Sequence, residues 1–198
     1  LLGEATFPAC IEDVKCAVRW LRAHAEEYGV DPERVGAYGN SAGAHLAAML
    51  ALCPPDAGLE GDGPWQEHSS TVQAAVCSAT PASFLIPMNN RFQRARTAEA
   101  DAAQPRRRVP EELRKKVSPI TYVSADAPPM LLFHDTADKT VFVAQGDALV
   151  KALQEAGAKD ITYKRYENGS GHGVFGKNIE ETGPAREAFF QRTLNRKQ

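Results

Sequence analysis

The stretch that decides the fold is VGAYGNSAGAHLAAMLAL, residues 35–52. Its first four residues form a short apolar run typical of a buried strand, and residues 42–52 favour a helix. Between them lies Gly39-Asn40-Ser41-Ala42-Gly43, a G-x-S-x-G pentapeptide. A serine at so tight a strand-to-helix turn adopts strained backbone geometry that lifts its hydroxyl above the sheet. We expect both glycines to remove side chains that would otherwise collide as strand and helix approach each other.

The same pentapeptide also occurs by chance on surface loops, and its position between a strand and a helix is what favours a catalytic interpretation here. In that position Ser41 is a candidate nucleophile, and the backbone N–H of Ala42 lies at a helix N-terminus. A free N–H and the helix dipole stabilise an oxyanion there. Because a serine hydroxyl is a poor nucleophile at neutral pH, the chain must also supply a histidine and a carboxylate.

Asp138 and His172 are the candidates for these two roles. Asp138 follows the apolar run 130–133, and His172 lies in a Gly-Ser-Gly-His-Gly segment after the run 161–166. Because the carboxyl ends of parallel strands meet at one edge of a sheet, we expect both residues to lie near Ser41. Asp135 shares the loop with Asp138, but it directly follows the strand and suits a turn cap, so we favour Asp138. The alternative for His172 is a histidine in a surface turn.

The other histidines are expected to have no catalytic role. His45 lies one helical turn after Ser41 and would have to fold back on its own helix, so we expect a packing residue. The sequence shows no partner for His24, His68 or His134, and we expect structural or surface roles for them.

The remaining chain alternates helices with strands. Apolar residues at helical spacing predict a helix over 11–28, which Gly29 ends, and a last helix over 184–194 with Thr182 near its start. Further expected helices are 42–52, 111–117 and 143–156, and expected strands are 35–38, 72–79, 130–133 and 161–166. This order predicts an α/β class with a mainly parallel sheet flanked by helices. Residues 81–128, rich in Pro, Arg and polar residues, break the pattern and predict a cap-like insertion.

Composition limits the kinds of partner. The 198 residues predict a single domain, 1–198, and no apolar run is long enough for a membrane span. With 23 Lys plus Arg against 25 Asp plus Glu, the net charge of −2 gives no positive field for nucleic acid. We interpret the basic clusters 106–108 and 114–116 as solvated surface rather than an anion site.

The cysteines have no metal-site spacing, so we expect reduced, buried thiols. The sequence spacing does not decide whether Cys53 and Cys77 form a disulfide. No metal or organic cofactor is expected.

Two blocks of sequence carry a resemblance to a known superfamily. The first runs from residue 8 to 52 and includes AVRWLR at 17–22 and YGVDPERV at 28–35; the second comprises SPITYV at 118–123, APP at 127–129, His134, Asp138, Val141, GHG at 171–173 and Phe175. Together they resemble the α/β-hydrolase esterase/lipase superfamily, and more narrowly hormone-sensitive-lipase-like and bifunctional feruloyl/acetyl-xylan esterases. The resemblance implies that Ser41, Asp138 and His172 are nucleophile, acid and base.

The chain departs from this superfamily in two ways. Asp135 stands where relatives commonly carry glycine, and no His-Gly-Gly loop, the source of further oxyanion donors in relatives, occurs in the sequence. That loop precedes the first helix in relatives, so we expect the chain to be the C-terminal portion of a hydrolase domain that lacks its N-terminal strands. We therefore expect the strand at 35–38 to lie at a sheet edge, covered by an upstream segment or by a second copy in a homodimer. With part of the oxyanion hole missing, the isolated chain is expected to be a weak esterase.

The leading hypothesis is a serine carboxyl-ester hydrolase acting on short-chain acyl esters. By resemblance, acetyl or feruloyl esters of carbohydrate are the expected substrates. A serine peptidase of the prolyl-oligopeptidase type uses the same order of triad residues and is the second hypothesis. The third is a non-catalytic binding module with a hydrolase fold. We assign no cellular compartment from the sequence.

Overall fold

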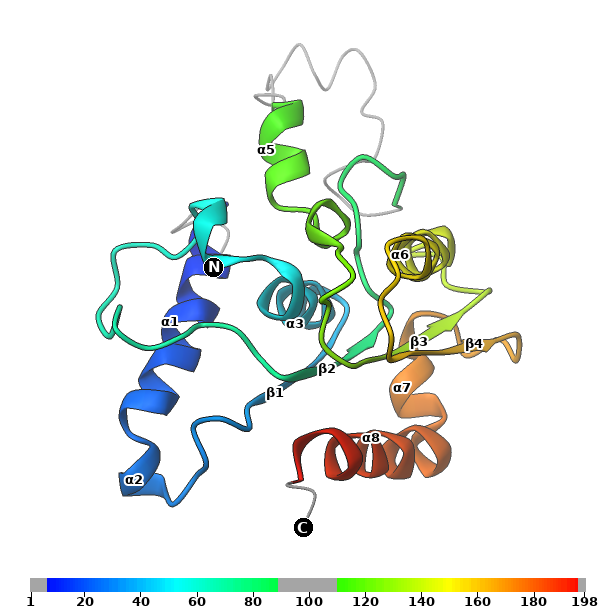
Figure 1. Ribbon diagram of the computed structural model, residues 1–198. Coiled ribbons are helices and arrows are strands. Elements are labelled where there is room, and N and C mark those ends of the chain that lie inside the picture. The colour runs from blue at the N-terminus through cyan, green and yellow to red at the C-terminus, as the bar shows by residue number, and fades with distance from the viewer. Residues whose placement is uncertain (1–6, 89–109, 196–198) are drawn as a thin grey trace, which may run out of the picture.

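The core of the protein is one fully parallel sheet. The computed structural model describes residues 7–88 and 110–195, and its four strands pair in the order β1-β2-β3-β4 (Figure 1). The strands are β1 (Gly36–Asn40), β2 (Ala74–Ser78), β3 (Met130–Asp135) and β4 (Ile161–Tyr166). The predicted α/β class is confirmed. Because all strands run in one direction, their carboxyl ends meet at one edge of the sheet.

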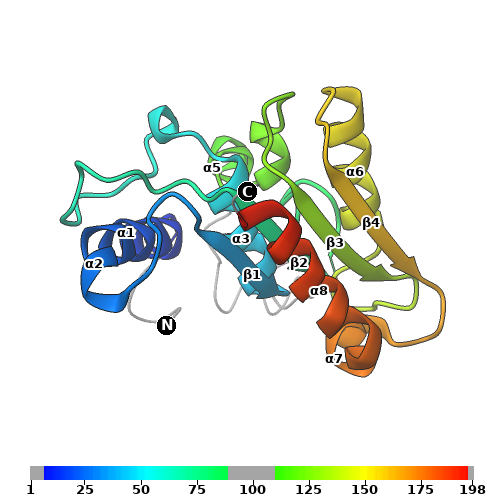
Figure 2. The same ribbon diagram turned by 60° about the horizontal axis from the view of Figure 1, so that its bottom comes forward.

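Helices cover both faces of this sheet. The described α-helices are α1 (Ala9–Ala23), α2 (Ala25–Tyr28), α3 (Ala42–Leu52), α5 (Glu111–Lys116), α6 (Ala144–Glu155), α7 (Val174–Lys177) and α8 (Ile179–Leu194). Helices α3 and α6 lie on one face, and α7 and α8 lie on the other (Figures 1 and 2). Alternate strand residues point to the two sides: Ala75, Cys77, Met130 and Leu132 toward α3 and α6, and Ala74, Val76, Leu131 and Phe133 toward α7 and α8.

The first and last helices differ most from the predicted ones. The helix expected over 11–28 is divided at His24, whose φ of −108° and ψ of 17° leave the helical region. The last helix begins at Ile179, so Pro184 lies inside it and Thr182 is buried within it rather than at its start. Pro184 is tolerated because the carbonyl left unpaired belongs to the exposed Glu180, where water can satisfy it. Gly29 does end α2, with a φ of +63°.

The segment expected as an insertion is described in part, because residues 89–109 lie outside the described residues. Its described end contains α5 and a 3₁₀-helix over Pro119–Tyr122, so the expected short helix near 111–117 is confirmed.

Among the described strands β1 lies at an edge of the sheet with β2 as its neighbour. Its pairing with an upstream segment or a second copy stays a prediction. No helix in the described residues is long and apolar enough to cross a membrane.

The four cysteines, Cys10, Cys16, Cys53 and Cys77, are free thiols. The bridge between Cys53 and Cys77 that the sequence left open is therefore absent. Cys77 is fully buried in β2, and burial raises the pKa of its thiol to about 12. Cys10 and Cys16 are only half-buried, so the expectation of burial was wrong for these two.

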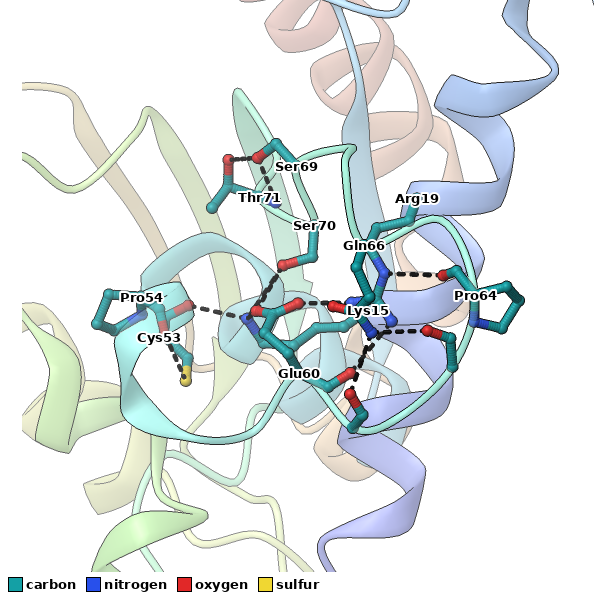
Figure 3. A network of polar contacts seen from close by, with 12 residues as sticks. Lys15, Arg19, Cys53, Pro54, Glu60, Pro64, Gln66, Ser69, Ser70 and Thr71 are labelled. Atoms are coloured by element: carbon teal, nitrogen blue, oxygen red, sulfur yellow. Dashed lines mark hydrogen bonds and ion pairs between the residues drawn. The ribbon is translucent and has the colours of Figure 1, made fainter.

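A buried ionic network attaches α1 to the segment between α3 and β2 (Figure 3). The side chains of Lys15 and Arg19 are 0% and 1% exposed, and both pair with Glu60. Lys15 Nζ lies 2.7 Å from Glu60 Oε1, and Arg19 Nη1 lies 2.5 Å from Oε2. Lys15 Nζ also donates to the Cys53 carbonyl and the Ser70 hydroxyl, so the ammonium has three acceptors. A buried charge is tolerated only when it is paired and hydrogen-bonded in this way.

We expect Glu60→Ala to destabilise the fold by about 3 kcal/mol, because it leaves two buried cations without their carboxylate. Burial alone would raise the pKa of Glu60, but the hydrogen bonds from Lys15 and Ser70 and the nearby positive charges outweigh burial and lower it. The stabilisation is therefore complete above the ordinary carboxyl pKa of about 4.3 and is lost as the pH falls through the lower folded value.

Urea unfolding of the wild type and the variant between pH 3 and pH 7 measures this difference. The two proteins are expected to differ at pH 7 and to converge in acid. The control is Glu67→Ala, since the Glu67 side chain is 70% exposed and its pair with His68 spans 3.6 Å. Equal stability of the Glu60 variant and the wild type at pH 7 would contradict the prediction.

Candidate active site

Ser41 occupies a strained turn between β1 and α3. Its φ of +55° is a conformation that a non-glycine residue rarely adopts, at a cost of about 1–3 kcal/mol. Two backbone hydrogen bonds hold the turn: the Ser41 N–H donates to the carbonyl of Ser78 on β2, and the His45 N–H donates to the carbonyl of Ser41. The predicted strained serine is confirmed. The surrounding sheet and helix fix its hydroxyl at the carboxyl edge.

Only the first glycine of the pentapeptide is required by this close approach. A Cβ on Gly39 would lie 2.1 Å from the carbonyl carbon and oxygen of Gly43, a distance that no packing adjustment relieves. A Cβ on Gly43 would meet nothing within 4 Å outside the backbone of its own helix. The expected collision at Gly43 was therefore wrong, because its missing side chain faces away from the strand.

The structure brings Ser41, His172 and Asp138 together. His172 lies in the 3₁₀-helix Gly171–Gly173 that follows β4, and its Nε2 is 2.9 Å from Ser41 Oγ. Its Nδ1 is 2.9 Å from Asp138 Oδ2. An ionised carboxylate can only accept, so Nδ1 carries the proton. In the neutral imidazole Nε2 is then free to accept the Ser41 hydroxyl proton.

Asp138 is held as an anion. Its side chain is fully buried, and Oδ1 accepts the N–H groups of Thr140 and Val141 at 2.8 and 3.0 Å. Burial alone would raise the pKa of Asp138, but hydrogen bonds from His134, His172 and these two N–H groups lower it far below its ordinary value. The carboxylate is therefore charged at neutral pH, as the proton on Nδ1 of His172 requires.

His134 contributes to this environment in a way that the sequence did not reveal. It is buried, its Nε2–H donates to the Val141 carbonyl at 2.8 Å, and Nε2 lies 3.5 Å from Asp138 Oδ2. The expectation of a structural role is confirmed, but the expected lack of a partner was wrong. Two features offered a signal: its place at the end of a buried strand and its spacing from Asp138.

The remaining candidates take the positions that the sequence favoured. The His172 imidazole pairs with Asp138 rather than with Asp135, which instead caps its own turn by accepting the Ala137 N–H at 2.7 Å. His45 is a buried packing residue whose Nε2 lies 2.7 Å from the Val117 carbonyl, and burial lowers its pKa.

Ala42 is the exposed first residue of α3. Because the first N–H groups of a helix have no carbonyl one turn before them, the Ala42 N–H has no acceptor within the helix. Within the described residues no cluster of His, Cys, Asp and Glu side chains could hold a metal ion.

Residues 1–153 match the family model BD-FAE. The chain belongs to the BD-FAE family. The match includes Ser41 and Asp138, whereas His172 lies beyond it. The resemblance to the α/β-hydrolase esterase/lipase superfamily is thereby confirmed.

Similar proteins include several esterases. The esterase LipQ of Mycobacterium tuberculosis is 37% identical over 174 residues, which are 82% of this chain and 38% of that protein. A truncated carbohydrate esterase from gut microbiota shares 28% identity with a TM-score of 0.79, covering 97% of this chain and 71% of that one. Thermogutta terrifontis esterase 2 phosphorylated by paraoxon shares 29% identity with a TM-score of 0.73, covering 95% and 65%.

These similarities show that this BD-FAE chain has the α/β-hydrolase fold. The chain spans less than half the length of curated relatives such as LipQ. Its own share of the fold holds the strands and turns that carry Ser41, Asp138 and His172.

We expect the two glycines of the BD-FAE pentapeptide to respond oppositely to alanine. Gly39→Ala forces a Cβ against the backbone of Gly43, so this variant should not form the native fold. Gly43→Ala should fold with unchanged or slightly raised thermal stability, because alanine favours a helix over glycine by up to about 1 kcal/mol. Circular dichroism on heating compares the two. Folding of the Gly39 variant at wild-type stability would contradict the backbone contact.

Proposed function

We propose that the chain is the catalytic portion of a serine carboxyl-ester hydrolase. Ser41 is the nucleophile, His172 the general base and Asp138 the acid of the triad, and the Ala42 N–H is an oxyanion donor. The observation that carries the proposal is the continuous hydrogen-bonded path from Ser41 Oγ through both ring nitrogens of His172 to Asp138, with 2.9 Å at each contact. A nucleophile, a base and a group that orients the base are the minimum for this chemistry.

Acylation follows from the positions of the protons. His172 Nε2 accepts the Ser41 proton as Oγ attacks the ester carbonyl carbon, and the ring becomes an imidazolium ion. Asp138 stabilises this cation because its own pKa is lowered and it remains charged. The carbonyl oxygen becomes an oxyanion, which the Ala42 N–H at the start of α3 stabilises.

Collapse of the tetrahedral intermediate completes the first half-reaction. His172 returns its proton to the departing alkoxide oxygen, the carbon–oxygen bond breaks, and the alcohol leaves an acyl group on Ser41. Water then gives a proton to His172 and attacks the acyl carbonyl in the same way. The products are a carboxylic acid and the regenerated Ser41 hydroxyl, with no metal or organic cofactor in any step.

The proposed substrates are short-chain acyl esters, including acetyl or feruloyl esters of carbohydrate. Support for a carbohydrate alcohol comes from the similarity to a carbohydrate esterase at 28% identity. The esterase names of the relatives support an ester over an amide substrate. This argues against the prolyl-oligopeptidase alternative, and the hydrogen-bonded Ser41–His172 pair argues against a non-catalytic module.

We expect Ser41→Ala to abolish hydrolysis of p-nitrophenyl acetate while leaving the fold intact, a loss on the order of 10⁶ in rate relative to the wild type. An organophosphate such as paraoxon should add its phosphoryl group to Ser41 alone, as mass spectrometry of peptides would show. Ser69→Ala is the control, because Ser69 is exposed on the segment between α3 and β2. Hydrolysis of a proline amide in preference to the ester would favour the peptidase, and normal esterase activity of the Ser41 variant would reject the assignment.

A further inference from the structure

Two turns at the carboxyl edge of the sheet meet at the buried side chain of Asp135. We call residues 136–141, which follow β3, the acid turn, and residues 167–173, which follow β4, the base turn. Asp135 is the last residue of β3 and is 0% exposed. Its Oδ1 accepts the Ala137 N–H of the acid turn at 2.7 Å and the Gly171 N–H of the base turn at 3.0 Å. Its Oδ2 accepts the Ser170 hydroxyl, also of the base turn, at 3.0 Å.

The turns are in contact as well as bridged. Gly171 has a φ of +60°, and a Cβ there would lie 3.4 Å from the Ala137 carbonyl oxygen. The backbone of the acid turn also continues the strand pairing, since the Thr136 N–H donates to the Tyr166 carbonyl at the end of β4. Asp138 and His172 therefore each follow closely on a backbone group that hydrogen-bonds the same carboxylate.

We propose that Asp135 is a positioning residue, which holds the His172 imidazole against Asp138 and Ser41 by joining the acid turn to the base turn. Its catalytic consequence rests on the proposed function, because the pair that it aligns is the base and acid of that reaction. Asp135 itself touches none of the reacting atoms. It acts through the backbone of Gly171, next to His172, and through the backbone of Ala137, next to Asp138.

A carboxylate suits this position because only an acceptor with two oxygens can receive three donors from two turns. The side chain is also ionised: burial alone would raise the pKa of Asp135, but the hydrogen bonds from Ala137, Gly171 and Ser170 lower it. A charged acceptor makes each of these hydrogen bonds stronger than a neutral one would. The hydrogen bonds to Asp135 thus fix the two turns relative to each other. This matters because a displacement of a catalytic group by about 1 Å costs up to about 100-fold in rate.

The kinetic test compares Asp135→Ala, Asp135→Asn and Asp31→Ala with the wild type on p-nitrophenyl acetate. Asp135→Ala should lower kcat by about 10- to 100-fold with little change in KM, because the hydrogen bonds to Asp135 position His172 rather than the substrate. Asp135→Asn should restore most of kcat, since its Oδ1 still accepts both N–H groups and its Nδ2 can donate to Ser170.

Asp31→Ala is the matched control, because Asp31 also caps a turn by accepting the Glu33 N–H. This turn precedes β1 and therefore lies at the amino edge of the sheet, away from Ser41. The kcat of Asp31→Ala should equal that of the wild type. Wild-type kcat in Asp135→Ala, or an equal loss in Asp31→Ala, would overturn the proposal.

A spectroscopic test does not depend on catalysis. The proton between His172 Nδ1 and Asp138 should give a downfield NMR resonance in the wild type that disappears in Asp138→Asn. It should be broadened or lost in Asp135→Ala and retained in Asp135→Asn and Asp31→Ala. An unchanged resonance in Asp135→Ala overturns the positioning role. If the wild type neither hydrolyses esters nor reacts with paraoxon, the proposed function fails, and this resonance still decides the role of Asp135.

A milder variant is available if Asp135→Ala does not fold. Ser170→Ala removes one of the three donors and keeps the carboxylate, so its kcat should fall about fivefold, the equivalent of one hydrogen bond. Its Nδ1 resonance should broaden as well. Wild-type kcat with an unchanged resonance in a folded Ser170→Ala protein would overturn the proposal.

Discussion

The contact between the backbones of Gly39 and Gly43 is the constraint on which the rest of the structure depends. No other residue at position 39 lets α3 begin so close to the end of β1, because any Cβ would lie 2.1 Å from a carbonyl group. The rest of α3 continues this close approach with small residues, and Ala44, Ala47 and Ala48 form its buried face against the sheet. The positive φ of Ser41 follows from the same geometry, since the chain must reverse within one residue.

The parallel sheet then carries the other two members of the site to Ser41. Strands β3 and β4 end beside β1 and β2 at the same edge, so the turns after them are neighbours although they are distant in sequence. Each turn is built on hydrogen bonds to a buried carboxylate. Asp138 accepts two N–H groups with one oxygen and faces His172 with the other, whereas Asp135 uses both oxygens within the turns. Two neighbouring aspartates therefore have different roles, which their donors determine.

The sequence predicted the parts of the structure that depend on local pattern. Helix α3 and strand β4 have the expected boundaries, because a strand-to-helix turn and a run of strand-forming residues are local signals. The pentapeptide and the order of Asp138 and His172 after strands predicted that these side chains meet. Pro184 misled the prediction, since a proline at a helix start and one inside a helix look alike when the exposure of the preceding turn is unknown.

Other features depend on contacts across the chain and could not be predicted from local pattern. Lys15 and Arg19 lie on a helix whose apolar stripe is evident, yet both are buried because Glu60, far away in sequence, pairs with them. The contact of His134 with Asp138 and the bridge from Asp135 to Ser170 depend on how two turns fold over one edge. Neither turn alone contains the information that the other lies beside it.

The separation of Ser41 and His172 by 131 positions has a consequence for the order of events during folding. Every neighbouring pair of the described strands is parallel, so none of these pairings can form as a local hairpin, and each must wait for a long crossover. Of the four described strands β4 is synthesised last, and the base turn follows it. Until that strand docks on β3, the Ser41 hydroxyl lacks its hydrogen bond to His172 Nε2. Under the proposed mechanism, Ser41 is therefore not activated in the unfolded chain and gains reactivity only after β4 has docked on β3.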